Sequence, residues 1–252
     1  MGKYQDAQID KELRQIVDML LLNGTLTECP GLLHGKIGIA IFFFHYAKYT
    51  GNDLFADYAI DLISETLNQI HVNSPADYKK GIAGIGVGID YLIQNSFLTV
   101  EDDICEDFDK LMFRAVMYDP WRDFSQHDGL IGYGRYWITR LRYQVPALQA
   151  RKCLSYTTGQ IAKKNIDIPM VEQTDVYYFL SDLCQIQGFE MCKRLLTQFK
   201  KQSVKNLPLT QITDLDMEKP PASTGLLNGY AGEGMMRLTA LNKANKSWMN
   251  LL

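Results

Sequence analysis

Two kinds of hydrophobic pattern alternate along the chain. Four segments carry apolar residues at three- and four-residue spacing among charged ones, which is typical of amphipathic helices with one wet face: 53–70, 100–117, 146–164 and 188–203. The segments between them are apolar nearly all round, as buried helices are: 37–46, 89–93, 136–141 and 235–241. The alternation predicts hairpins, each made of an inner helix followed by an outer helix.

A glycine-rich segment recurs at the start of the inner helices. Four copies align without gaps and begin at His34, Ile82, Asp128 and Asn228. Their starts lie 48, 46 and 100 residues apart, and the last gap is close to two periods. The period therefore predicts a degenerate fifth repeat near residue 178, where the stretch 175–187 is helical in pattern but lacks the glycines.

About five such hairpins fill the chain, and no long linker rich in Gly, Ser or Pro divides it. We therefore expect an all-α fold in which residues 1–252 form a single α/α toroid, with an open solenoid as the alternative closure. The longest irregular segment, 206–224, is a candidate loop over one end.

Glycine is unfavourable inside helices, so the recurring cluster needs a physical reason. It allows neighbouring helices to approach closely, or it permits a tight turn into the helix. A third interpretation is that side-chain-free helix N-termini present backbone N–H groups to a ligand. The Gly84–Gly88 run does not fit a nucleotide-binding loop, since no strand precedes it and no Lys-Ser/Thr pair follows.

Composition narrows the class of protein. A formal net charge of −3 argues against a nucleic-acid binder, which normally carries a basic excess. The most apolar run, 37–44, is much shorter than the roughly 20 residues that a membrane-spanning helix needs, so we expect no membrane insertion. The five cysteines are scattered and odd in number, which favours free thiols in the cytoplasm.

The glycine segments also resemble a known family. Gly31–Ala40, Lys80–Gln94, Asp128–Leu141 and Ser223–Leu241 are similar, in this order, to glycine motifs of the lanthionine synthetase C-like family. Members of that family fold as α/α toroids, usually of seven hairpins. The resemblance implies the same fold here, with fewer hairpins, and a precursor peptide as the partner.

The family's cyclases form thioether rings in such peptides. They use a zinc ion held by a cysteine in a Trp-Cys-x-Gly motif and by a Cys-His pair, because zinc stabilises the thiolate nucleophile. This chain has neither motif, and Leu227-Asn228-Gly229 stands where Cys-His-Gly is expected. The sequence therefore predicts a member without a metal site or another cofactor, which is not a competent cyclase.

Candidate binding residues come from the first position of each glycine segment and its neighbours. If the inner helices point to one mouth, the polar side chains gathered there are His34, His127, Asp128, Asp175, Asn228 and Glu233. The competing interpretation is that Asp128 and Asn228 cap their helices, with His34 in the same role. A buried Glu233 would need a basic partner, which Arg135 or Arg237 could supply.

Two functions of different class remain open. The first is a zinc-free lanthionine synthetase C-like protein that binds or positions a peptide in a peptide-modification pathway. The second is an enzyme of the glycosidase kind, which would use carboxylates in the toroid mouth. Whether the chain is an enzyme at all is left open, since fold alone does not decide between the two functions.

Overall fold

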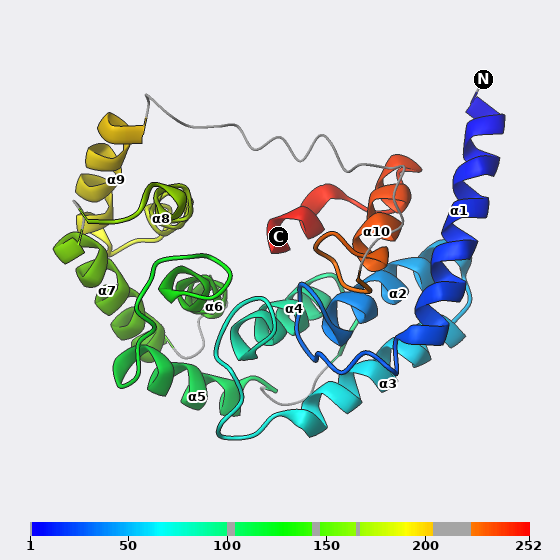
Figure 1. Cartoon of the computed structure of the whole chain (residues 1–252), viewed down its shortest axis with the longest axis horizontal. Coiled ribbons are helices and arrows are strands. Elements are labelled where there is room, and N and C mark those ends of the chain that lie inside the picture. Colours follow the sequence, from blue (N-terminus) through cyan, green and yellow to red (C-terminus); the bar gives the residue numbers. More distant parts are fainter. Residues whose placement is uncertain (1, 100–103, 143–146, 165–166, 204–222) are drawn as a thin grey trace. The chain divides into compact units, whose positions relative to one another are not determined.

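A computed structural model of the chain is helical throughout the residues that it describes, 2–99, 104–142, 147–164, 167–203 and 223–252 (Figure 1). Over these residues, β structure is limited to one isolated bridge between Ser223 and Gly229. The all-α prediction is confirmed. The segment 206–224, predicted as an irregular loop, falls almost wholly outside the described residues.

The helices follow the two predicted patterns. Those predicted as inner are α2 (Lys36–Thr50), α4 (Ile82–Gln94), α6 (Leu130–Arg142) and α10 (Tyr230–Ala240), and the degenerate repeat contributes α8 (Met170–Leu183). Those predicted as outer are α3 (Leu54–Gln69), α5 (Glu106–Met117), α7 (Ala147–Lys164) and α9 (Glu190–Ser203). The chain also has α1 (Gly2–Asn23) and a short 3-10 helix η1 (Lys246–Leu251).

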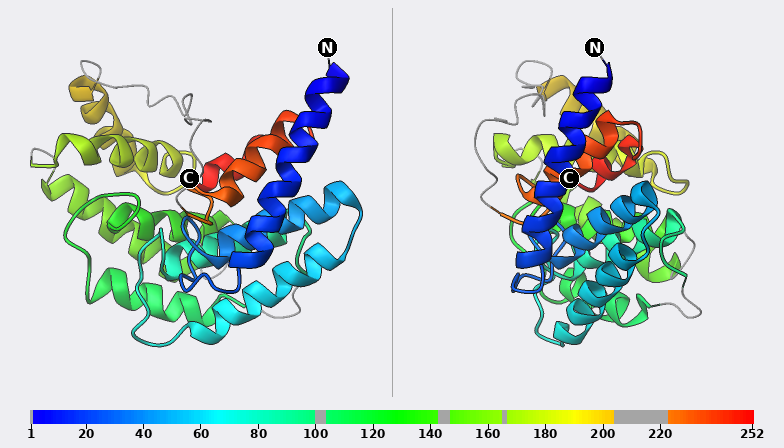
Figure 2. Two further views of the ribbon diagram at one scale, coloured as in Figure 1. Left: turned by 45° about the vertical axis from the view of Figure 1, so that its right-hand side comes forward. Right: turned by 90° about the vertical axis from the view of Figure 1, so that its right-hand side faces the viewer.

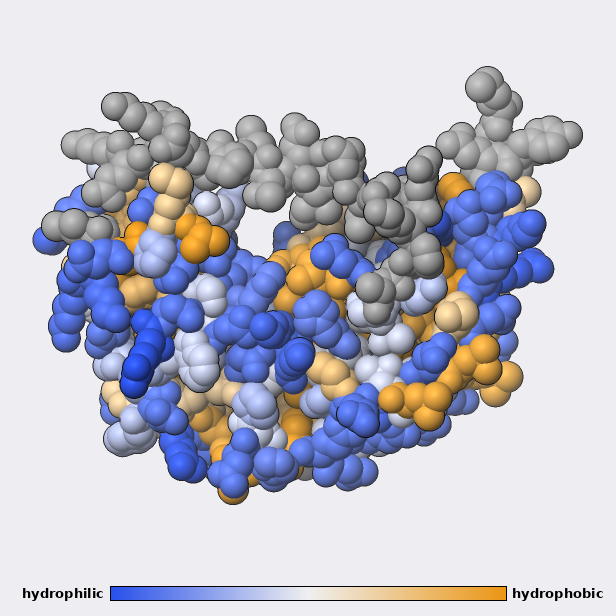
Figure 3. All heavy atoms as spheres, viewed as in Figure 1, coloured by the Kyte–Doolittle hydropathy of each residue, from blue (hydrophilic) through white to orange (hydrophobic). Residues whose placement is uncertain are grey.

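Burial separates the two classes in the predicted way. The first twelve residues of α2 and the first nine of α4 are all buried, whereas α3 buries only one stripe. The face seen in Figure 3 is mostly hydrophilic, with apolar side chains among the polar ones. Helix α6 is also buried over most of its length, whereas α8 buries only Val176, Phe179, Leu180 and Leu183, so the degenerate repeat departs from this pattern.

The chain divides into two compact units. Unit 1 comprises Met1–Pro75, Lys79–Glu101 and Asp214–Leu252, and unit 2 comprises Ala76–Tyr78 and Asp102–Thr213. Because each unit is built from the same kind of inner and outer helix, the repeat is shared by both. That residues 1–252 form one domain stays a prediction.

In unit 1, helix α2 packs against α3, α4 and α10. The N-terminal helix α1 lies alongside α10, at the opposite end of the sequence (Figures 1 and 2). Arg237 on α10 donates to Glu12 on α1 at 2.9 Å, which fixes this pairing. Helix α1 thus serves as the outer helix for the last inner helix.

In unit 2, helix α6 packs against the outer helix α7 and the next inner helix α8, and α8 packs against α9. Helix α5 contacts both α6 and α7. The degenerate repeat therefore keeps the inner–outer arrangement without its glycines.

The glycines are explained by close packing. A Cβ on Gly134 would lie within 3.0 Å of the Phe179 ring on α8, and one on Gly234 would meet Phe42 on α2 in the same way. Gly88 faces Ile37 across the α2–α4 contact at a similar separation. The steric interpretation is confirmed, because these glycines let inner helices approach more closely than a side chain would allow.

No helix within the described ranges has the length and apolar character needed to cross a membrane.

Candidate functional site

Each glycine-bearing inner helix is preceded by a seven-residue loop that folds back on the helix start. We call these the lead-in loops: 29–35, 75–81, 123–129 and 223–229. In each, the N–H of the first helical residue donates to the carbonyl of the first loop residue, at 3.0, 2.9, 3.1 and 2.9 Å in turn. The same hydrogen bond in four copies shows that the repeat includes this loop as well as the helix.

The glycine that ends each loop is required by this closure. A Cβ on Gly35, Gly129 or Gly229 would lie within 3.0 Å of the backbone of its own loop. The tight-turn interpretation is therefore also confirmed.

The loops define the register of the repeat and correct the sequence alignment. Helices α2, α4, α6 and α10 begin after Gly35, Gly81, Gly129 and Gly229. The residue equivalent to His34 is therefore Lys80, and the alignment that placed Ile82 there was wrong by two residues. The alternating glycines Gly84, Gly86 and Gly88 match the glycine pattern in both registers, so the sequence alone does not distinguish the two registers.

His34 and Asn228 do not occupy the N-cap positions of α2 and α10. Gly35 and Gly229 occupy the N-cap positions of α2 and α10, and neither helix has a side-chain cap. Asn228 instead has a positive φ of 53°, a conformation that asparagine tolerates better than most residues. Asp128 stands two residues before α6, because Gly129 lies between them.

The helix N-termini do not offer free N–H groups to a ligand at α10. The amides of Tyr230, Ala231 and Gly232 donate to the loop carbonyls of Ser223, Thr224 and Gly225 at 2.9–3.2 Å. The next amide, Glu233, makes a helical bond to Gly229. The anion-binding interpretation of the glycines is therefore wrong for this helix, because all of its first-turn donors are used.

Neighbouring loops are joined edge to edge by backbone hydrogen bonds. In unit 1, Leu227 N–H donates to Leu33 C=O at 2.9 Å, and Leu33 N–H donates to Lys79 C=O at 3.1 Å. In unit 2, Tyr78 N–H donates to His127 C=O at 2.9 Å. The loops of different repeats thus form a continuous backbone edge within each unit.

Asp175 takes the place of a loop in the degenerate repeat. Its carboxylate accepts from Gln126 N–H at 2.7 Å, and Glu172, one turn earlier on α8, accepts from Phe124 N–H at 2.8 Å. The pKa of Asp175 is raised by burial, although the Gln126 amide and the charges of His127 and Arg135 oppose this shift. Two carboxylates of α8 therefore accept the amides of the loop 123–129. In the other repeats, a backbone carbonyl of the next loop accepts the corresponding hydrogen bond.

The candidate residues fall into two groups. Unit 1 holds His34, Asn228 and Glu233, and unit 2 holds His127, Asp128 and Asp175. His127 and Asp128 are partly exposed in the loop that Asp175 holds. Convergence of all six on one mouth stays a prediction.

Glu233 has the basic partner that the sequence predicted. It pairs with Arg237 one turn later on α10 at 2.7 Å, and Arg237 also pairs with Glu12 at 2.9 Å. Its carboxylate is thereby used in joining α10 to α1.

Sequence reasoning missed a group of side chains around Tyr133 on α6. Tyr133 is only 4% exposed. Burial raises the pKa of Tyr133, and the carboxylates of Asp77, Asp119, Asp123 and Asp128 raise it further. The aspartates are visible in the sequence, but their common neighbour is not, because Asp77 comes from another repeat.

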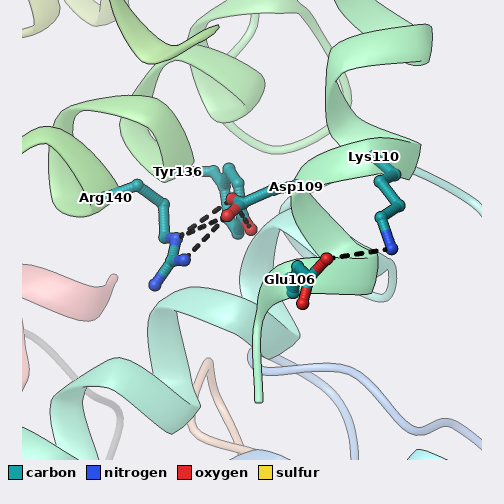
Figure 4. Close-up of polar contacts among 5 residues, drawn as sticks. All are labelled: Glu106, Asp109, Lys110, Tyr136 and Arg140. Carbon is teal, nitrogen blue, oxygen red and sulfur yellow. Dashed lines mark hydrogen bonds and ion pairs between the residues drawn. The ribbon is translucent and has the colours of Figure 1, made fainter. Parts of the chain in front are cut away.

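Sequence reasoning also missed a buried ion pair in unit 2 (Figure 4). Arg140 on α6 donates to Asp109 on α5 through Nη2 at 2.7 Å and Nε at 3.0 Å, and Tyr136 Oη donates to the same carboxylate at 2.6 Å. All three side chains are buried. Burial, followed by the negative charge of Asp109, raises the pKa of Tyr136 well above its usual range. This cluster is closed to solvent and joins an outer to an inner helix.

No group of three or more His, Cys, Asp or Glu side chains is arranged to hold a metal over the part of the chain that the structure describes. None of the five cysteines is part of a disulfide in the described structure, and burial raises the pKa of Cys153 to about 12 and that of Cys192 to about 11. These two buried thiols do not favour the thiolate form in which a cysteine binds zinc.

No protein-family model matches the chain, and no curated protein matches it.

Proposed function

We propose that this chain is a lanthionine synthetase C-like protein that binds a peptide and holds no zinc. The observation that carries the proposal is the position of the sixth residue of each lead-in loop. His34 and Asp128 are partly exposed and Lys80 and Asn228 are exposed, whereas the glycine that follows each is buried. Each of the four lead-in loops thus presents a polar side chain, which suits recognition of an extended peptide.

We further propose that the repeats close into one α/α toroid in the cytoplasm. Contacts within unit 1 support this closure. The loop 223–229 is joined to the loop 29–35, although the two lie near opposite ends of the sequence. Helix α1 covers α10 as an outer helix covers its inner partner. Chain ends that pack as neighbouring repeats are what a ring requires and an open solenoid lacks.

The glycosidase alternative has less support. It needs carboxyl groups that are available in the mouth, and the predicted Asp175 and Glu233 already have structural partners. Asp175 accepts a backbone amide, and Glu233 pairs with Arg237. Peptide binding therefore remains the better interpretation.

The test is a pull-down of the tagged chain from its native host without chelator, with mass spectrometry of small peptides and elemental analysis of the same sample. We expect a cysteine-bearing peptide and no stoichiometric zinc. The double variant His34→Ala/Asn228→Gly should lose the peptide, because glycine keeps the positive φ of residue 228 while removing its side chain. The exposed residue His71 provides a control variant, His71→Ala, which should retain it.

Stoichiometric zinc, or thioether rings in the recovered peptide, would contradict the proposal. Recovery of no peptide with the wild-type chain would contradict it as well.

A further inference from the structure

The fifth residue of a lead-in loop links its loop to a neighbour on either side. In unit 1, Leu33 N–H donates to Lys79 C=O at 3.1 Å, and Leu33 C=O accepts from Leu227 N–H at 2.9 Å. The two backbone groups of Leu33 therefore point to opposite neighbours. Each loop in this edge donates on one side and accepts on the other.

Leu227 holds the same position in the loop 223–229, which lies beside the loop 29–35 (Figure 1). Its N–H is used by Leu33, but its carbonyl accepts from none of the described backbone amides. Because both loops close with the same hydrogen bond, this carbonyl faces away from Leu33, as the Leu33 carbonyl faces away from Lys79. Leu227 is partly exposed and Asn228, which shares its peptide bond, is exposed. The backbone edge of unit 1 thus ends in an acceptor at the surface.

A second copy of the chain does not supply the missing donor. To continue the edge, the copy would have to offer a lead-in loop with an edge-forming amide to spare. Leu33, Leu227 and Tyr78 donate to carbonyls of neighbouring loops. Phe124 and Gln126 donate to carboxylates of α8. The amides that join the loops are therefore already used within each copy.

An extended peptide has the group that this end of the edge lacks. In an extended backbone, N–H groups point sideways while the side chains project above and below, so an N–H can donate to an open edge whatever the neighbouring side chains are. Proteins that add a peptide strand to the edge of a sheet use the same backbone hydrogen bonds. A peptide at this end would lie next to Asn228, whose side chain belongs to the polar set of the lead-in loops.

We propose that an extended segment of the bound peptide donates a backbone N–H to Leu227 C=O and so continues the edge of the lead-in loops. This inference rests on the proposed function, because it names the part of the peptide that is recognised here, its backbone.

The test uses the intact chain and a short peptide selected on it from a displayed random library. Labelling leucine carbonyl carbons and asparagine backbone nitrogens gives NMR signals only from Leu-Asn pairs, which the sequence has at 22–23, 67–68, 227–228 and 241–242. The variant Asn228→Gly lacks one of these signals and so identifies it, while glycine keeps the positive φ of residue 228. We expect the peptide to shift the Leu227 carbonyl signal more than the other three, which serve as controls.

A second measurement finds the donor on the peptide. Each peptide N–H is replaced in turn by an ester oxygen, which cannot donate a hydrogen bond. We expect one replacement to weaken binding about two- to tenfold, the contribution of one hydrogen bond, and to abolish the shift of the Leu227 carbonyl. Replacements at positions that face away from the edge should do neither.

The remaining outcomes distinguish this inference from the proposed function. Binding of the peptide without a preferential shift of the Leu227 signal would overturn the inference and leave peptide binding intact. A shift that survives every ester replacement would overturn it as well. A shift that appears when the chain alone is concentrated would assign the edge to a second copy. Failure to enrich any peptide would contradict both proposals.

Discussion

Gly232 on α10 shows at the scale of one residue why the repeat needs glycine. A Cβ at this position would lie within 3.0 Å of the carbonyl oxygen of Leu226 in its own lead-in loop. Gly38 and Gly132 face the carbonyls of Leu32 and Gln126 in the same way. Since the obstacle is backbone, no rotation of a side chain relieves it.

Gly232→Ala should therefore destabilise the protein by about 1–3 kcal/mol, the usual cost of overpacking. The matched control is Gly159→Ala in the interior of α7, where no atom lies within 4 Å of an added Cβ. That variant should gain about 0.5–1 kcal/mol from helix propensity. Urea denaturation measures both, and equal effects would contradict the steric explanation.

His45 on α2 should make stability depend on pH. Its Nε2 lies 2.9 Å from Tyr91 Oη, and burial, with a smaller contribution from the charge of Lys48, lowers its pKa to about 4. In the unfolded chain the imidazole takes up a proton below about pH 6.5, whereas in the folded chain it stays neutral to about pH 4. Stability should therefore fall as pH falls through this window, by up to about 3 kcal/mol.

Urea midpoints from pH 7 to pH 4.5 measure this dependence against the variant His45→Gln, which cannot titrate. The difference between the two proteins should shrink or reverse toward low pH. A difference that is constant with pH would contradict this account, because it would mean that His45 has the same pKa in the folded and the unfolded chain.

The chemistry of single residues could be predicted where a partner lies nearby in sequence. Glu233 and Arg237 are one turn apart on a helix, so their pairing followed from the pattern. The partners Asp109 and Arg140 are on different helices, and nothing in their spacing connects them. The same is true of Asp77 and Tyr133, which explains why sequence analysis found neither group.

At the scale of elements, the Asp109–Arg140 pair should be essential to the α5–α6 contact. Arg140→Met leaves a buried carboxylate without its cation and should cost about 3–5 kcal/mol. The double variant Asp109→Leu/Arg140→Met should recover most of that loss, since it leaves no buried charge.

Lys110 supplies the control on the same helix. It pairs with Glu106 at 3.2 Å in full solvent, so Lys110→Met should leave the unfolding midpoint unchanged (Figure 4). If Arg140→Met and Lys110→Met reduce the stability by the same amount, burial does not explain the contribution of the Asp109–Arg140 pair.

The attachment of the loop 123–129 to α8 is a second property of elements. The double variant Glu172→Ala/Asp175→Ala removes the acceptors for the amides of Phe124 and Gln126. Hydrogen exchange at these two amides should speed up at least about tenfold, because their protection comes from the lost bonds. Asp182→Ala on the same helix should not change it, and unaltered exchange in the double variant would show that other contacts hold the loop.

At the scale of the whole molecule, the periodic patterns in the sequence predicted most of the helices. The alternation of fully and partly apolar segments predicted the inner and outer helices, and the period predicted α8 without its glycines. The lead-in loops were not predicted, because their closing hydrogen bonds use backbone groups that leave no residue pattern apart from the final glycine. Whether the repeats close into one ring depends on contacts between segments that are distant in the sequence. The period of the sequence does not predict such contacts.

The proposed single toroid is tested most directly by the coupling of the two units during unfolding. In the variant Trp248→Phe, the remaining tryptophans, Trp121 and Trp137, both lie in unit 2. Adding Gly232→Ala destabilises unit 1, and urea denaturation followed by tryptophan fluorescence then reports on unit 2. One toroid predicts that the fluorescence midpoint falls with the added substitution, because a single domain unfolds cooperatively. An unchanged midpoint would contradict it, since unit 2 would then unfold independently.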